Sequence, residues 1–149
     1  MYRRILVATD GSDFANMAVE QAADLAAGLG AELYIVTVSE ALPVFSAAEI
    51  GWSLPQDVYE QMRKADAAKA RRILDKAMGI ARRHGAPVHD IHIAGQDPYA
   101  GILEAAGNIK ADLIVLASHS KSVVDRLLLG SQASKVLSLA TIPVLVVRS

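Results

Sequence analysis

Four short runs of mostly branched aliphatic residues stand out along the chain and predict buried strands. Each run is nearly continuous rather than alternating, which is typical of a parallel sheet covered by helices on both faces. A fifth run, over residues 88–94, sets His89 and His92 among apolar residues, so we expect a strand with one more polar face near a sheet edge. The four buried runs are Ile5–Ala8, Leu33–Val36, Leu113–Leu116 and Val144–Val147.

Between these runs, apolar residues recur at intervals of three and four and predict four helices. Ser12 is a candidate N-cap for the first helix, and Gly28 or Gly30 is expected to end it. Asp97 and Pro98 suit the N-cap and the first position of the third helix. The apolar stripes are Phe14, Ala18, Ala22, Leu25, Ala26 and Leu29; Ala70, Ile73, Ala77, Ile80 and Ala81, within a charged segment over 56–85; Ile102, Leu103, Ala106 and Ile109; and Leu129, Ala133, Val136, Leu137 and Ala140, before Pro143.

Strands and helices alternate along the whole chain, as β-α-β-α-β-α-β-α-β. That order predicts an α/β fold, with a single doubly wound parallel sheet, helices on both faces and right-handed crossovers. A length of 149 residues fits one domain, so we expect a single domain over residues 1–149. The stretch from Ser39 to Pro55 is too long for an ordinary connection in such a fold. Two interpretations of it stay open: a surface loop, or a lid or partner contact beside a pocket.

Composition excludes several classes of protein. The 15 basic and 16 acidic residues leave a formal net charge of −1, which argues against a domain that binds nucleic acid through its phosphates. No apolar run approaches the roughly 18 residues that span a bilayer, and no signal-peptide pattern is present. The chain has no cysteine, which excludes disulfides, cysteine-bound metals and thiol catalysis. We therefore expect a compact cytoplasmic protein that neither binds nucleic acid nor inserts into a membrane.

Two turns are candidates for chemistry, because ligands of open α/β sheets bind beyond the carboxyl ends of the strands. The turn after the first strand is Ala8-Thr9-Asp10-Gly11-Ser12-Asp13. The Asp10 carboxylate could bind hydroxyls, amines or a metal; alternatively, it only stabilises the turn. The turn after the fourth strand begins Ala117-Ser118-His119-Ser120 and leads to Gly130 and Ser131. Small hydroxyl residues at a helix entrance suit a phosphate, and an ordinary serine-rich turn is an equally good interpretation.

Other catalytic and cofactor motifs are absent from the sequence. It contains neither a glycine-rich dinucleotide fingerprint after the first strand nor a Walker A sequence, and no Gly-x-Ser-x-Gly nucleophile elbow. His89 and His92 are three residues apart on a predicted strand, so they point to opposite faces and do not share a zinc ion. The charges between Arg63 and Lys76 indicate a solvated helix face with local ion pairs.

Six segments carry a pattern that is specific when they are taken together. They are Arg4–Ser12, Val36–Val38, Asp112–His119, Leu127–Ser131, Lys135–Leu137 and Ile142–Val147. Combined, they resemble the universal stress protein family, and the resemblance covers essentially the whole chain. The first segment is similar to the family's first strand and acidic turn, the second to its second strand and the third to its fourth strand. The last three are similar to the closing segment by which the family is most easily identified.

The resemblance implies a five-stranded parallel sheet in the order 3-2-1-4-5 and homodimers that pair through the last strand, Val144–Val147. It also implies an adenine nucleotide, ATP or else ADP or AMP, with Mg²⁺ where the nucleotide is bound. In nucleotide-binding members, Asp10 matches a ribose or adenine contact, Val38 matches the backbone that recognises the adenine edge, and Gly130 and Ser131 match the outer phosphate contacts. The site residues implied are Ala8, Thr9, Asp10, Val38, Ala117, Ser118, His119, Ser120, Gly130, Ser131 and Gln132.

The sequence departs from the family pattern after the fourth strand. Nucleotide-binding members carry the motif G-x2-G-x9-G-[S/T], which falls here on Ala117, Ser120, Gly130 and Ser131. The last two positions match and the first two do not. Ser120 places a side chain where the backbone would approach a phosphate, although its hydroxyl could donate a hydrogen bond to that phosphate instead.

Three functions therefore compete. The first is a dimeric stress-response protein that senses adenine nucleotide and acts through an unknown protein partner. The second is a nucleotide-free dimeric interaction module of the same family. The third is a slow ATPase, for which Asp10 and Ser131 could hold metal and phosphate, but the sequence offers no general base or arginine clamp. We accordingly assign no catalytic residue.

Overall fold

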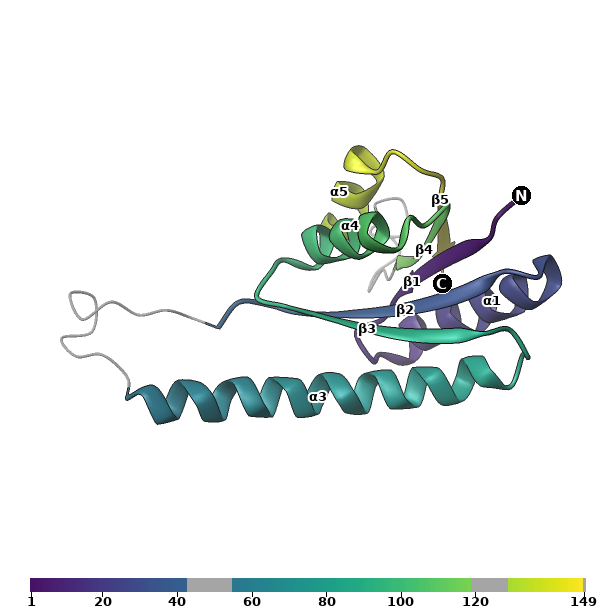
Figure 1. The fold of residues 1–149 in the computed structure, drawn as a ribbon. Helices are drawn as coiled ribbons and strands as arrows, with labels where there is room; N and C mark the ends of the chain where they lie inside the picture. The colour runs from purple at the N-terminus through teal and green to yellow at the C-terminus, as the bar shows by residue number, and fades with distance from the viewer. Residues whose placement is uncertain (43–54, 119–128, 149) are drawn as a thin grey trace.

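Five parallel strands form one sheet in the order β3-β2-β1-β4-β5 (Figure 1). The structure, a computed structural model, describes residues 1–42, 55–118 and 129–148. The α/β class and the strand order 3-2-1-4-5 are confirmed. The strands are β1 (Arg4–Ala8), β2 (Glu32–Ser39), β3 (Val88–Ala94), β4 (Leu113–Ser118) and β5 (Val144–Arg148), and the described helices are α1 (Asp13–Leu29), α3 (Gln56–Arg82), α4 (Pro98–Ile109) and α5 (Ser131–Leu139).

The helices cover the sheet in two layers, with α1 and α3 on one face and α4 and α5 on the other (Figure 1). Neighbouring residues of β1 therefore face different layers. Ile5 and Val7 pack against α1 and α3, and Leu6 packs against α4 and α5. All three side chains are fully buried. Burial on both faces is the reason that the central strands are continuously apolar.

The predicted ends of α1 and α4 are largely confirmed. The Ser12 hydroxyl accepts a hydrogen bond from the Ala15 amide at 3.2 Å, which caps α1. Gly30, not Gly28, ends that helix, with a left-handed φ of 66° that favours glycine. Asp97 occupies the N-cap position of α4, with Pro98 next, but its side chain makes no capping hydrogen bond.

Three apolar residues of the predicted stripes either lie outside a helix or are exposed. Helix α5 begins at Ser131, so Leu129 precedes it rather than lining it. Leu137 is 38% exposed and Leu29 is 46% exposed. The short helix α5 packs on β4 and against α4 and buries only Ala133 and Val136, which leaves its flank open. Leu29 lies in the last turn of α1, past the last buried residue of that helix, Ala26.

Strand β3 lies at one edge of the sheet, as predicted. His89 stacks on Tyr34 with ring centroids 4.6 Å apart. His92 Nε2 lies 2.8 Å from the Ser39 hydroxyl. Tyr34 packs in the α4 and α5 layer, whereas Ser39 is five residues further along β2 and points to the opposite face. The two histidines therefore point to opposite faces, as predicted.

Three further predictions concern the charged helix α3, membrane-spanning segments and the stretch from Ser39 to Pro55. Arg71 pairs with Asp75 and Asp90, which confirms local ion pairs on the charged helix. In the described ranges, no helix combines the length and the apolar character needed to cross a membrane. Residues 43–54 lie outside those ranges, so the two interpretations of the stretch from Ser39 to Pro55 stay predictions.

Candidate functional site

A cavity of about 240 Å³ lies at the carboxyl edge of the sheet, where β1 is flanked by β2 and β4. Chain connections from β1 and β4 leave in opposite directions along the sheet, since β1 leads to β2 and β4 leads to β5. Such a reversal point is where open α/β sheets bind ligands. The fold therefore opens a cavity at the place where its topology predicts one.

The floor and walls of the cavity are mostly apolar. Strand residues such as Val36, Val38 and Leu116 meet Ile102 from α4 and Val136 from α5 around it. Small side chains complete the lining and keep the space open: Ala8, Ala15, Ala117 and Ala133. An apolar slot of this kind suits a flat aromatic ring, because the ring leaves water without losing hydrogen bonds from its faces.

Polar groups gather at the turn after β1. The Asp10 carboxylate accepts a hydrogen bond from the Ser12 amide at 2.9 Å, and the Thr9 hydroxyl accepts one from the Gly11 amide at 3.1 Å. Gly11 has a φ of +85°, and a Cβ there would lie 2.9 Å from Cγ1 of Ile73. Both facts require glycine, so the turn that presents Asp10 to the cavity is held in one shape.

Sequence reasoning did not single out Asn16. The Thr9 hydroxyl donates to Oδ1 of Asn16 at 3.2 Å, beneath the turn. Nδ2 of Asn16 is buried and has no hydrogen-bond partner in the part of the chain that the structure describes. An unpartnered buried donor costs about 1–3 kcal/mol. The signal of Asn16 in the sequence is one amide side chain in the otherwise apolar run of residues 14–19.

The N-terminus of α5 lies beside the cavity. Gly130 is its N-cap, with φ −58° and ψ 154°, and has no side chain to accept a hydrogen bond from the first turn. Gly130 therefore marks the start of this helix. The first amides of a helix have no partners within it and carry the positive end of its dipole. This terminus is accordingly suited to an anion such as a phosphate.

Gln132 ties the first turns of two helices together. Its Oε1 accepts a hydrogen bond from the Tyr99 amide of α4 at 2.9 Å. Lys135, one turn further along α5, holds its ammonium 4.9 Å from the centre of the Tyr99 ring. These contacts fix α4 and α5 relative to each other where they border the cavity.

The structure brings together six of the eleven predicted site residues as cavity lining: Ala8, Thr9, Asp10, Val38, Ala117 and Gln132. Gly130 and Ser131 lie beside it at the start of α5 and are exposed. Ser118 ends β4 as a buried side chain that does not line the cavity. His119 and Ser120 lie outside the described residues.

Nine further lining residues were not predicted as part of the site: Ser12, Phe14, Ala15, Val36, Pro98, Ile102, Leu116, Ala133 and Val136. Most of them had been assigned to apolar stripes, strands or helix caps. A stripe residue that lines a cavity and one that fills the core have the same sequence signal, because both are apolar and recur at the same spacing.

The described lining of the cavity holds few groups for acid–base or metal chemistry. Asp10 supplies the one carboxylate among the described lining residues, and none of these residues is a histidine. Among the residues that the structure describes, no group of three or more His, Asp or Glu is placed to hold a metal ion. A Mg²⁺ ion at Asp10 would need phosphate oxygens as further ligands, which is a common arrangement for Mg²⁺.

Comparison with known proteins gives a consistent result. A profile described as the universal stress protein family matches residues 1–148. The chain is 35% identical over 148 residues to a universal stress protein of Thermus aquaticus, covering 99% of this chain and 100% of that protein. It is 34% identical over 149 residues to universal stress protein MJ0531 of Methanocaldococcus jannaschii, covering 99% and 83% respectively. A crystal structure of a universal stress protein in complex with cAMP superposes with a TM-score of 0.72 at 29% identity, covering 99% of this chain and 97% of that one.

Proposed function

Because this chain belongs to the universal stress protein family, we propose that it binds an adenine nucleotide in the cavity at the carboxyl edge of its sheet. The observation that carries the proposal is the juxtaposition of an apolar slot with the N-terminus of α5. The slot suits the base, and the helix terminus suits the phosphates. The solved relative that holds cAMP supports the adenine class of ligand. The proposed ligand is ATP, or else ADP or AMP.

In this proposal, each part of the nucleotide has its own group of residues. The base packs against Val38 and the small side chains of the slot, and the Asp10 carboxylate accepts hydrogen bonds from the ribose or the base. The backbone amides of Gly130 and Ser131 donate hydrogen bonds to the outer phosphates. A Mg²⁺ ion bound with the nucleotide would neutralise phosphate charge, with Asp10 as its candidate protein ligand.

Calorimetric titration of the purified protein with MgATP tests the proposal, together with mass spectrometry of the protein as purified. We expect heat of binding or a retained purine nucleotide. The absence of both at millimolar MgATP would contradict the proposal.

Replacing Asp10 with asparagine should weaken ATP binding by about 10- to 100-fold, because a hydrogen bond to a charged group contributes about 1.5–3 kcal/mol. Asparagine keeps an oxygen for the Ser12 amide, so the turn should keep its shape. Titration with ATP measures the affinity. Asp13→Asn is the matched control: Asp13 is also acidic and exposed, but it does not line the cavity. An equal loss in both variants would argue against a direct role for Asp10.

We further propose a homodimer that pairs through β5, the second edge of the sheet. Leu145 is 42% exposed on this edge strand, and such an apolar edge is otherwise prone to aggregation. At about 500 mM NaCl, where attraction between exposed charges is screened, Leu145→Arg should shift the protein from dimer to monomer, because it brings like charges together across the pairing edge. Sedimentation velocity measures the mass. A dimer that survives this change at that salt concentration would contradict pairing through β5.

The nucleotide-free interaction module remains the alternative, since Ser120 departs from the motif of nucleotide-binding members. A Ser120→Gly variant distinguishes the two proposals. If ATP binds only to that variant, the native chain acts without nucleotide. The slow ATPase is the third function, and it requires phosphate release that Asp10→Ala abolishes.

As a whole, we propose that residues 1–149 act as one cytoplasmic domain that senses nucleotide and signals to a protein partner. The binding of that partner would depend on whether the cavity is occupied.

A further inference from the structure

The outward face of α1 is acidic. Asp13, Glu20 and Asp24 lie on one side of the helix with Met17 between them, at spacings of four, three and four residues. All four side chains are exposed, and Met17 is 51% exposed. The helix contains no basic residue, so its net charge is −3. We call these four residues the acidic stripe.

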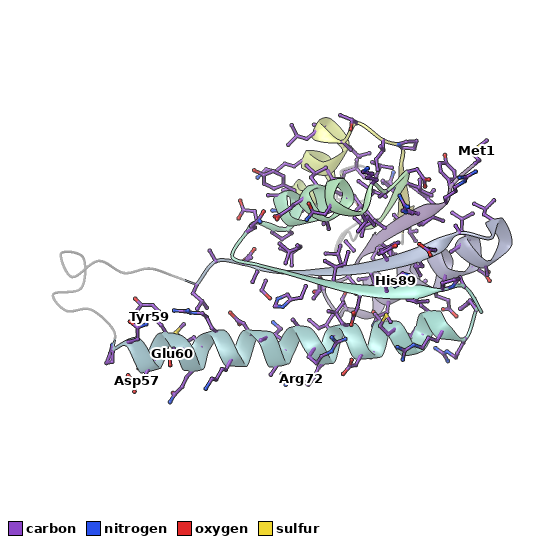
Figure 2. All side chains as sticks on the ribbon, viewed as in Figure 1. Met1, Asp57, Tyr59, Glu60, Arg72 and His89 are labelled. Atoms are coloured by element: carbon purple, nitrogen blue, oxygen red, sulfur yellow. The ribbon has the colours of Figure 1, made fainter. Side chains whose placement is uncertain are left out.

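The outward face of the neighbouring helix α3 is basic. The helix carries seven basic and four acidic residues, a net charge of +3. Its buried positions, such as Leu74 and Ala77, face the sheet, so Arg72 and Lys76 project to the other side. Figure 2 shows Arg72 on the side of α3 that faces away from the sheet. We call Arg72, Lys76 and the exposed Arg83, which follows the helix, the basic stripe.

The charges of the two stripes are largely unneutralised within the chain. His84, at the end of α3, lies 3.0 Å from a carboxylate oxygen of Asp24 and 3.9 Å from one of Glu20. Apart from these contacts, the acidic stripe has no ion-pair partner among the described residues, and the basic stripe has none. The two helices belong to one layer of the fold (Figure 1). This layer therefore presents the acidic stripe beside the basic stripe.

We infer that this layer is a self-complementary surface that binds a second copy of the same chain. A two-fold axis parallel to the helices would place α1 of each copy against α3 of the other. Every acidic stripe would then face a basic stripe, twice per dimer, as a symmetric interface requires. Met17 would supply an apolar contact near the middle of each pair. The surface lies on the sheet face away from α5 and does not depend on nucleotide binding or on the β5 edge.

The alternation of charge favours this occupant over a polyanion. A nucleic acid or an anionic membrane is attracted to the basic stripe but repelled by the acidic stripe beside it. A second copy of the chain would pair opposite charges with both the acidic and the basic stripe. Because both stripes are exposed, the attraction should fall as salt rises.

The test measures association by sedimentation velocity in about 20 mM and about 500 mM NaCl, which differ severalfold in screening length. In the Leu145→Arg background, which isolates this surface from β5, we expect a dimer whose dissociation constant rises roughly tenfold or more at the higher salt. Arg72→Glu with Lys76→Glu should abolish the dimer, and so should Glu20→Lys with Asp24→Lys. All four changes in one chain should restore it, because the two stripes have then exchanged charge.

Circular dichroism checks that each variant is folded, and Arg3→Glu with Arg4→Glu is a matched control that changes net charge equally on another part of the surface. Self-association that is absent at low salt, or that the combined variant does not restore, would overturn the inference. A heparin column tests whether the surface binds a polyanion instead. If the unmodified protein binds heparin through Arg72 and Lys76 but does not self-associate, the partner is a polyanion and the inference is wrong.

Discussion

Replacing Gly130 with aspartate is expected to weaken MgATP binding by at least about 100-fold while leaving the protein as stable as before. Gly130 is the N-cap of α5 with φ −58° and ψ 154°, a conformation that aspartate adopts readily. A Cβ at this position meets no atom of the described residues within 4 Å. Two like charges about 4 Å apart near a protein surface repel by roughly 4 kcal/mol, so a carboxylate beside the outer phosphates would oppose their binding.

The same carboxylate should stabilise α5, so a loss of ATP affinity can be distinguished from a loss of protein stability. Aspartate is a better N-cap than glycine by a few tenths of a kcal/mol, so the melting temperature should stay the same or rise. Gly130→Asn is the matched control, because asparagine caps the helix equally well and carries no charge. We expect Gly130→Asn to retain ATP affinity within about tenfold. Aspartate and asparagine variants of equal affinity would show that the phosphates do not lie at α5.

Replacing Gly101 with alanine is expected to destabilise the fold and to disturb the cavity. A Cβ at Gly101 would lie 2.6 and 2.7 Å from the two methyl carbons of Val38 and 3.2 Å from Cγ2 of Ile93. Valine has a stiff side chain, so Val38 has to move, and it lines the cavity. Overpacking costs about 1–3 kcal/mol, against a gain of about 1 kcal/mol from alanine in a helix. We expect a net loss of up to about 2 kcal/mol in urea unfolding, and weaker ATP binding.

Gly107→Ala is the matched control on the same helix. In the part of the chain that the structure describes, nothing lies within 4 Å of a Cβ at Gly107, so this change should stabilise the protein by up to about 1 kcal/mol. Adding Val38→Ala to Gly101→Ala should recover part of the lost stability, because it removes the two methyl groups in conflict. If Gly101→Ala were as stabilising as Gly107→Ala, the close packing of α4 on β2 would be contradicted.

The stability changes expected at Gly101 and Gly107 depend on contacts between distant segments, which the sequence alone does not reveal. The elements themselves were predictable: Ser12 caps α1, and each predicted strand lies within an observed one. The turn after β1 was identified as a candidate from its position and its aspartate. Its rigidity was not, because it depends on Ile73, which lies in a different helix more than sixty residues away.

Local patterns were thus enough to establish the α/β class, the element boundaries to within a few residues, and the two turns where a ligand was expected. These features follow from hydrophobic periodicity, capping and turn formation, which act over a few residues along the chain. Only the folded structure distinguishes a stripe residue that fills the core, such as Ala18, from the exposed Leu137 and from Ile102, which lines the cavity. It alone shows the Gln132 contact with Tyr99 and the acidic and basic stripes side by side. These properties depend on distances between segments far apart in sequence, and such distances arise only when the layers pack.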